Sequence, residues 1–186
     1  MGASNLPLYA SSSVIAEMDK REAMEPFSPV QVVAMQGFEP SEGCGFELVF
    51  VPVPHRDEFA DTHAIIVRGP SKTVLFLPDH DRWDSTLSEH DVGTIREWLS
   101  ELGVDIALID GSFWDSNALP GRDMSEIPHP TVSESLMRLG WRDERDPEIH
   151  FIHLNHSNPL LKHEREHDEL TGMGWAVCWQ GQNFSL

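Results

Sequence analysis

The sequence predicts an α/β fold, and three observations carry that prediction. Short apolar segments bounded by Pro and Gly follow one another between residues 31 and 77, as is typical of β-strands. A segment with helical spacing at residues 88–103 leads directly into an apolar run at 104–109, a step that indicates a βαβ unit. At 186 residues, the chain is long enough for one domain with a real core and short for two.

The first 80 residues are predicted to hold one helix and four strands. Residues 1–10 read as the approach to a short strand, and Ser11 caps a helix at 11–24 that Pro26 ends. Pro52 indicates that the second strand lies at a sheet edge or carries a bulge. The four predicted strands cover residues 31–36, 46–53, 63–68 and 73–77, and the turn at 69–72 joins the last two as a hairpin.

The second half is predicted to alternate helices with strands. Ser88 with Asp91 resembles a capping box, and Gly103 ends the helix that follows. One face of that helix is apolar and consists of Val92, Ile95, Trp98, Leu99 and Leu102. The remaining predicted elements are a strand at 104–109, an irregular loop at 111–130, a helix at 131–140 capped by Thr131 with Glu134, a strand at 149–154, an acidic helical piece at 164–170, and a hairpin of 175–179 with 183–186.

The amino-acid composition disfavours some classes of binding partner for this protein. Thirteen Lys and Arg residues against 31 Asp and Glu give a net charge of −18, which disfavours nucleic acid and anionic membranes as partners. Two cysteines, Cys44 and Cys178, make neither a disulfide framework nor a metal motif. No stretch approaches the ~20 apolar residues that span a bilayer, and no signal region opens the sequence, so we expect a cytoplasmic protein.

Histidines gather in and after the predicted strand at 149–154. Three of them, His150, His153 and His156, fall within seven residues, and His156 stands in the polar turn that precedes Pro159. Metal ligands and catalytic bases are often mounted on a loop held by a rigid strand. A histidine-rich edge strand bonded to backbone explains the same residues, and the stretch alone leaves both interpretations open.

Strand after strand ends in a possible metal ligand. The residues in question are His55, Asp79, Asp110 and His156. If these strands run parallel or lie in facing sheets, their ends meet at one rim, where a His/Asp/His set suits zinc, iron or manganese. Taken singly, each residue also has a structural explanation. Residues 79–81 can form a turn bonded to backbone, and His129 between two prolines can be a packing residue.

Five stretches, in order, carry a resemblance to a known family. They are Val53-Pro-His-Arg-Asp-Glu-Phe-Ala-Asp-Thr62, Leu77-Pro-Asp-His-Asp-Arg-Trp83, Asp110-Gly-Ser-Phe-Trp114, Gly121-Arg-Asp-Met124 and Ile152-His-Leu-Asn-His-Ser-Asn-Pro159. Together they resemble the coenzyme PQQ biosynthesis protein B (PqqB-like) branch of the metallo-β-lactamase fold. The resemblance implies an αβ/βα sandwich with a metal site at one rim.

The same resemblance assigns roles to residues. It implies that His55, Asp79 and His156 are metal ligands, with Asp79 as the carboxylate that bridges two ions. A further set of residues is expected behind the ligands or on the substrate side, namely Asp110, His129, His153 and Asn158. The resemblance implies a divalent transition metal, zinc first and iron or manganese as alternatives, and it assigns no catalytic residue.

One departure from the family pattern weakens the expected site. The main metal motif of the fold, His-x-His-x-Asp-His, does not occur in these 186 residues, and residues 1–10 resemble family sequence that follows it. We therefore expect a single partial domain over residues 1–186, incomplete at its N-terminal side. Such a domain would hold one metal weakly and would leave a sheet edge exposed to association with another chain.

Three functions follow as hypotheses. The first is a PqqB-like, metal-dependent hydrolase or oxygenase, linked to pyrroloquinoline quinone (PQQ) biosynthesis and impaired in a truncated chain, with a small-molecule or peptide-derived substrate. The second is a non-catalytic module that binds or carries PQQ or its precursor. The third is an inert fragment that needs a partner chain to complete its fold.

Overall fold

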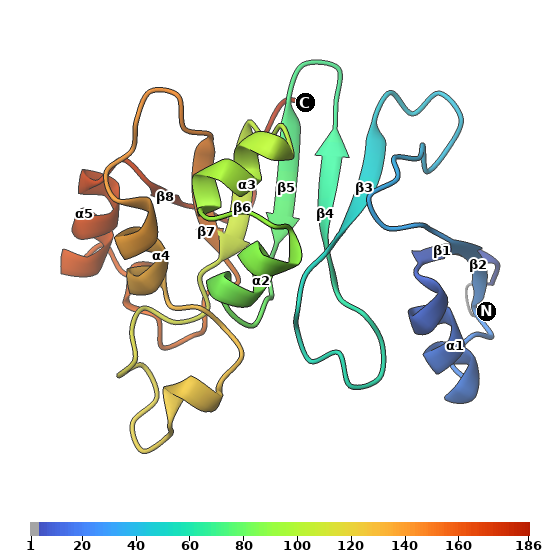
Figure 1. Ribbon diagram of the computed structural model, residues 1–186, viewed down its shortest axis with the longest axis horizontal. Helices are drawn as coiled ribbons and strands as arrows, with labels where there is room; N and C mark the ends of the chain where they lie inside the picture. The colour runs from blue at the N-terminus through green and yellow to red at the C-terminus, as the bar shows by residue number, and fades with distance from the viewer. Residues whose placement is uncertain (1–3) are drawn as a thin grey trace.

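The computed structural model describes residues 4–186, which form a six-stranded mixed sheet, a two-stranded parallel sheet and five α-helices (Figure 1). The strands are β1 (Leu6–Ala10), β2 (Phe27–Gln31), β3 (Glu47–Pro52), β4 (His63–Arg68), β5 (Thr73–Leu77), β6 (Ile106–Asp110), β7 (Glu148–Ile152) and β8 (Ala176–Val177). The helices are α1 (Ser12–Lys20), α2 (Trp83–Glu89), α3 (Ile95–Glu101), α4 (Val132–Leu139) and α5 (Arg165–Gly172), with 3-10 turns at Met124–Glu126 and Pro159–Leu161.

The direction of each strand in the large sheet decides where its loops meet. The strand order follows the sequence from β3 to β8. Strand β4 pairs antiparallel with both β3 and β5, and the pairs from β5 through β8 are parallel. Strands β3, β5, β6 and β7 therefore all run the same way, and their carboxyl ends lie at one edge of the sheet. Pro52 closes β3, which is an edge strand of this sheet, as its sequence predicts.

Helices α2, α3 and α4 cover one face of the large sheet (Figure 1). The apolar stripe predicted for the helix before β6 is confirmed, since Ile95, Trp98 and Leu99 are all buried. Trp83 packs its ring edge against Trp98 and donates a 2.8 Å hydrogen bond from its indole nitrogen to Ser135 of α4. This contact joins the three helices into one layer over the sheet.

Several predicted elements begin and end where the sequence predicts. Strands β4 and β5 have the predicted bounds. Thr131 caps α4 by accepting a hydrogen bond from the amide of Glu134, and Gly140 ends the helix with a positive φ of 64°. No helix among residues 4–186 combines the length and apolar character that crossing a membrane requires.

The single helix predicted for residues 88–102 is wrong, because two helices occupy residues 83–101. Ser88 lies near the end of α2, and Asp91 has a φ of +55°, which breaks the helix. The cap of α3 is Thr94, which accepts a hydrogen bond from the amide of Glu97 at 3.1 Å. The Glu97 carboxylate in turn accepts one from the amide of Gly93 at 2.8 Å.

Other predicted elements are corrected at both ends of the chain. The first helix ends at Lys20 and not at residue 24, and the strand predicted at 31–36 lies earlier, as β2, where it pairs parallel with β1. The C-terminal hairpin is wrong, because β8 pairs parallel with β7 and residues 183–186 form no strand. Leu186 packs instead against Gly69, where an added side-chain carbon would lie 2.3 Å from the Leu186 Cβ.

Candidate metal centre

Polar side chains from four strand ends meet at one edge of the large sheet. His55 follows β3, Asp79 follows β5, Asp110 is the last residue of β6, and His153 follows β7. The common direction of these strands brings the side chains together, as the sequence pattern predicts. Crevices at the carboxyl ends of parallel strands are common places for ligand sites.

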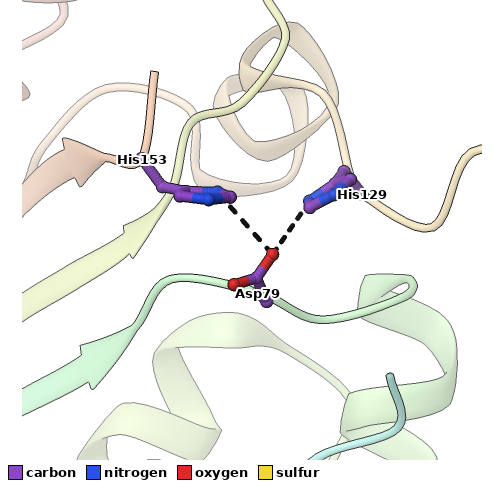
Figure 2. Close-up of side chains that lie close together, drawn as sticks. All are labelled: Asp79, His129 and His153. Carbon is purple, nitrogen blue, oxygen red and sulfur yellow. Dashed lines mark ion pairs between the residues drawn. The ribbon is translucent and has the colours of Figure 1, made fainter. Parts of the chain in front are cut away.

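The Asp79 carboxylate lies at the centre of the group (Figure 2). Its Oδ1 atom is 3.7 Å from Nδ1 of His153 and 3.8 Å from Nδ1 of His129. Nε2 of His55 lies 3.8 Å from the same oxygen. One oxygen therefore faces three imidazole rings that come from three different segments of the chain.

His129 is held by a buried carboxylate. Its Nδ1 atom lies 2.7 Å from Oδ2 of Asp110, a residue with no solvent exposure, and Oδ1 of Asp110 accepts a 2.9 Å hydrogen bond from the amide of Ser112. Burial works to lower the pKa of His129, but the hydrogen bond and charge of Asp110, together with Asp79, outweigh it and raise the pKa above its ordinary value.

Ser112 connects two of the histidines. Its hydroxyl lies 2.8 Å from Nδ1 of His153 and 3.3 Å from Nδ1 of His129. Asn158 holds the backbone at residues 111–112 in place, because its buried side-chain amide donates hydrogen bonds of 2.7 Å and 3.4 Å to the carbonyls of Gly111 and Ser112. The two rings are thus fixed relative to each other before any ligand binds.

The backbone at His153 is unusual. Strand β7 ends at Ile152, and His153 has a φ of +58°, a left-handed conformation that is uncommon for a residue with a side chain. The conformation costs roughly 1–2 kcal/mol and persists only where neighbouring contacts enforce it. It marks the point where β7 stops and the His153 ring turns towards Asp79.

Of the three ligands predicted from the sequence, His55 and Asp79 lie close together and His156 does not join them. The structure brings His55 to Asp79, whereas the His156 side chain is exposed and makes no hydrogen bond or ion pair within residues 4–186. Asp110 and Asn158 lie behind the rings, in supporting positions. His129 and His153, predicted for the surroundings, form the closest histidine group with Asp79, all donor atoms lying within 4.8 Å of one another. The assignment of His55 and His156 as ligands stays a prediction.

The donor set fits a divalent transition metal. One carboxylate oxygen and two imidazole nitrogens are donors that zinc, iron and manganese accept. Beside them, Nδ1 of His55 and Oδ1 of Asp81 are buried and lie 3.3 Å apart, yet neither forms a hydrogen bond with the described residues. Leaving such atoms unsatisfied is costly, and a nearby cation would offset that cost for the carboxylate.

His80 belongs to the supporting structure and not to the donor group. It is fully buried, its Nδ1 lies 2.9 Å from the Thr86 hydroxyl, and its ring stands edge-on to Trp83. Burial lowers the pKa of His80 to about 4, so the ring is neutral at pH 7. A neutral His80 adds no positive charge beside the site.

A cavity of about 310 Å³ opens beside His129. It is bordered by Asp81, Arg82, Asp84, Met124, Ile127 and Glu134, among others. Its size is at the lower end of the range for small-molecule sites. A substrate bound there would reach the histidine group from the side of the 111–130 loop.

Solved structures of similar shape share the metallo-β-lactamase fold, and this chain has that fold. Zinc-bound PqqB from Methylobacterium extorquens has a TM-score of 0.72 and 18% identity, over 98% of this chain and 65% of that one. A diphosphatase of the PhnP family has a TM-score of 0.59 and 17% identity, over 100% of this chain and 61% of that one.

A third solved structure is similar to a lower degree. The metallo-β-lactamase fold protein YhfI from Bacillus subtilis has a TM-score of 0.55 and 16% identity, over 94% of this chain and 61% of that one. The chain thus spans a little under two thirds of each of these three proteins. No protein-family model and no curated protein sequence matches it.

Proposed function

We propose that this chain binds one divalent transition metal through Asp79, His129 and His153, as part of a metal-dependent hydrolase of PqqB-like architecture. The observation that carries the proposal is the Asp79 oxygen that faces three imidazoles within 3.8 Å. His55 is a further ligand in this scheme. Zinc is the first candidate, since the similar PqqB structure binds zinc, and iron or manganese suit the same donors.

The surrounding residues prepare the ligands. In this scheme Asp110 would accept the Nδ1 proton of His129, so His129 would bind the ion through Nε2, the ring nitrogen that then carries the free lone pair. Ser112 fixes the ring orientation of His153. A bound divalent ion would supply Lewis-acid polarisation of a substrate oxygen. The cavity beside His129 would bind the substrate, which we propose to be a small molecule or a peptide-derived precursor of PQQ.

We expect little turnover from these 186 residues alone. The sequence holds no His-x-His-x-Asp-His motif, so fewer ligands are available than a two-metal site uses. The same observation favours a second candidate, a binding or carrier module that retains the cavity and one weakly held ion without chemistry.

Equilibrium dialysis against zinc, with metal analysis of the purified protein, tests the binding proposal. Asp79→Asn should weaken zinc binding at this site at least ~10–100-fold, so that the variant retains one zinc ion fewer per chain in dialysis. Asp57→Asn is the matched control, because it removes the same charge from an exposed position two residues after His55, and it should bind as the wild type does. Unchanged zinc binding by Asp79→Asn would contradict the proposed site.

Turnover tests whether these 186 residues retain any hydrolase activity. A chromogenic phosphodiester, incubated with zinc-loaded protein, should be hydrolysed at the rate of zinc alone. Robust hydrolysis that Asp79→Asn abolishes would overturn the expectation of weak turnover and establish catalysis. Retention of PQQ in dialysis, without any turnover, would support the carrier.

A further inference from the structure

A second pair of histidines lies outside the site described above. His163 precedes α5 and His167 lies within it, four residues later, and their ring centroids are 4.6 Å apart at an interplanar angle of 74°. The Trp179 ring, just after β8, lies 5.3 Å from His163 and 6.2 Å from His167. His163 is exposed and His167 is half-buried, so solvent reaches the pair.

The spacing of the two rings matches that of two imidazoles on one ion. With a metal–nitrogen bond of ~2.0–2.1 Å, the centroid of an imidazole lies ~3.2 Å from the ion that it binds. Two such rings at bond angles of about 90–109° have centroids ~4.5–5.2 Å apart. The observed 4.6 Å falls within that range, so the two ring positions are compatible with one shared ion.

The charges around the pair favour a cation. Glu164 is the N-cap residue of α5, and Glu166 and Asp168 lie in its first turn. Residues 162–169 hold four acidic side chains against the two basic ones of Lys162 and Arg165, so this stretch is net negative. The chain as a whole carries a net charge of −18. Imidazole ligands select Cu²⁺, Ni²⁺ or Zn²⁺ over the hard alkaline-earth ions, and the surrounding carboxylates lower the cost of bringing a dication to the surface.

We propose that His163 and His167 together chelate a divalent copper, nickel or zinc ion at the surface of α5. Two protein ligands with solvent completing the coordination make this a weaker site than a closed one. It uses none of the side chains at the Asp79 centre. The Trp179 indole beside both rings serves as its reporter, because a bound paramagnetic ion quenches a neighbouring indole.

Tryptophan fluorescence during titration with NiCl₂ tests the proposal. The full chain is used with Asp79→Asn, so that the other centre does not contribute. Nickel should quench the emission with a saturating midpoint, and His163→Gln and His167→Gln should each raise that midpoint at least tenfold. Either variant with an unchanged midpoint would show that the two rings do not share an ion.

Two tryptophan variants identify the reporter. Trp179→Phe should remove most of the quenching while dialysis still detects the bound nickel. Trp141→Phe is the matched control, because Trp141 is also exposed and lies elsewhere, after α4, and its replacement should leave the quenched amplitude unchanged. Quenching that survives Trp179→Phe would place the ion away from His163 and His167. This result is independent of whether the Asp79 centre binds zinc.

Discussion

Two neighbouring rows of residues cross the large sheet and differ sharply in burial. One row faces the helices and consists of Val49, Ile66, Leu75, Ala107 and Ile149, none more than 3% exposed. The next row faces the other way and consists of Phe50, Ile65, Phe76, Leu108 and His150. In that row, Phe76 is 42% exposed.

The difference shows which face of the sheet the described residues cover. Helices α2 to α4 close the first face, and Asp79 and His153 directly follow strands β5 and β7 of that closed core. The second face is equally apolar but covered only in places, for example where Phe184 packs against His150. A one-residue shift along each strand separates the two faces, so single substitutions can compare them directly.

Adjacent residues of β5 give the largest expected contrast. Leu75→Ala should lower the free energy of unfolding by ~2–5 kcal/mol, because it leaves a cavity in a close-packed core. Phe76→Ala should cost about 1 kcal/mol, since its ring already meets solvent. Urea denaturation of both variants measures the two values. Equal losses would mean that the second face is as well packed as the first.

The Arg96–Asp146 pair should show an intermediate effect on the helix-covered side. Arg96 donates 2.6 Å and 2.7 Å hydrogen bonds to Asp146 and also binds the carbonyls of Leu139 and Trp141, which ties α3 to the segment after α4. Because Arg96 is partly exposed, its ion pair alone contributes little. The hydrogen bonds raise the expected cost of Arg96→Met to ~1–3 kcal/mol.

The same pair predicts a pH dependence. The hydrogen bond from Arg96 outweighs burial and lowers the pKa of Asp146 below its ordinary value of 3.8. A lowered folded-state pKa stabilises the protein above pH 3.8, and that contribution is lost as the pH falls towards the folded-state pKa. The stability difference between wild type and Asp146→Asn should therefore shrink from pH 7 to pH 3 in urea titrations. A difference that is constant over this range would contradict the assignment.

Removing the caps of α4 and α1 should give the smallest difference in the free energy of unfolding. Thr131 caps α4, which buries four residues, whereas Ser11 caps α1, which buries none. Thr131→Ala should lower the unfolding free energy by ~1 kcal/mol. Ser11→Ala, which also removes the hydrogen bond from Ser11 to Asp61, should lower it by less, because α1 buries no residue. Hydrogen exchange should show the Ser11→Ala effect confined to the α1 amides. Loss of protection throughout the sheet would show that α1 is part of the core.

Local signals explain which elements the sequence predicts correctly. The hairpin of β4 and β5 has a Gly-Pro turn between two continuous apolar runs, and α4 has a cap and a terminal glycine. The break between α2 and α3 is not predicted from the sequence, because Ser88 and Asp91 resemble the start of a helix but lie at the end of α2. The true cap at Thr94 lay inside the predicted helix.

The sequence predicts where the side chains around Asp79 gather, but it does not predict that His129 and His153 lie closest to Asp79. The rule that parallel strands end at one edge brings His55, Asp79 and Asp110 together. His129 arrives there because hydrogen bonds from the amides of Val132 and Ser133 to the carbonyls of Phe113 and Trp114 draw the ends of its loop together. That closure depends on contacts across 19 residues, which no local pattern encodes.

The sequence places His153 in the predicted strand at 149–154, because apolar residues continue to Leu154. The left-handed conformation at His153 ends β7 two residues earlier and turns the ring to the rim. Ser112, which fixes that ring, lies two residues after Asp110 in the stretch 110–114, but only the structure shows its role.

Anomalous diffraction from zinc-soaked crystals tests the central claim most directly. The account predicts a zinc peak bonded to the Asp79 carboxylate and to His129 and His153, with ligand distances of ~2.0–2.2 Å. A peak at His163 and His167 would bear only on the second site. Zinc bound elsewhere on the protein, with the Asp79 carboxylate uncoordinated, would contradict the proposed centre.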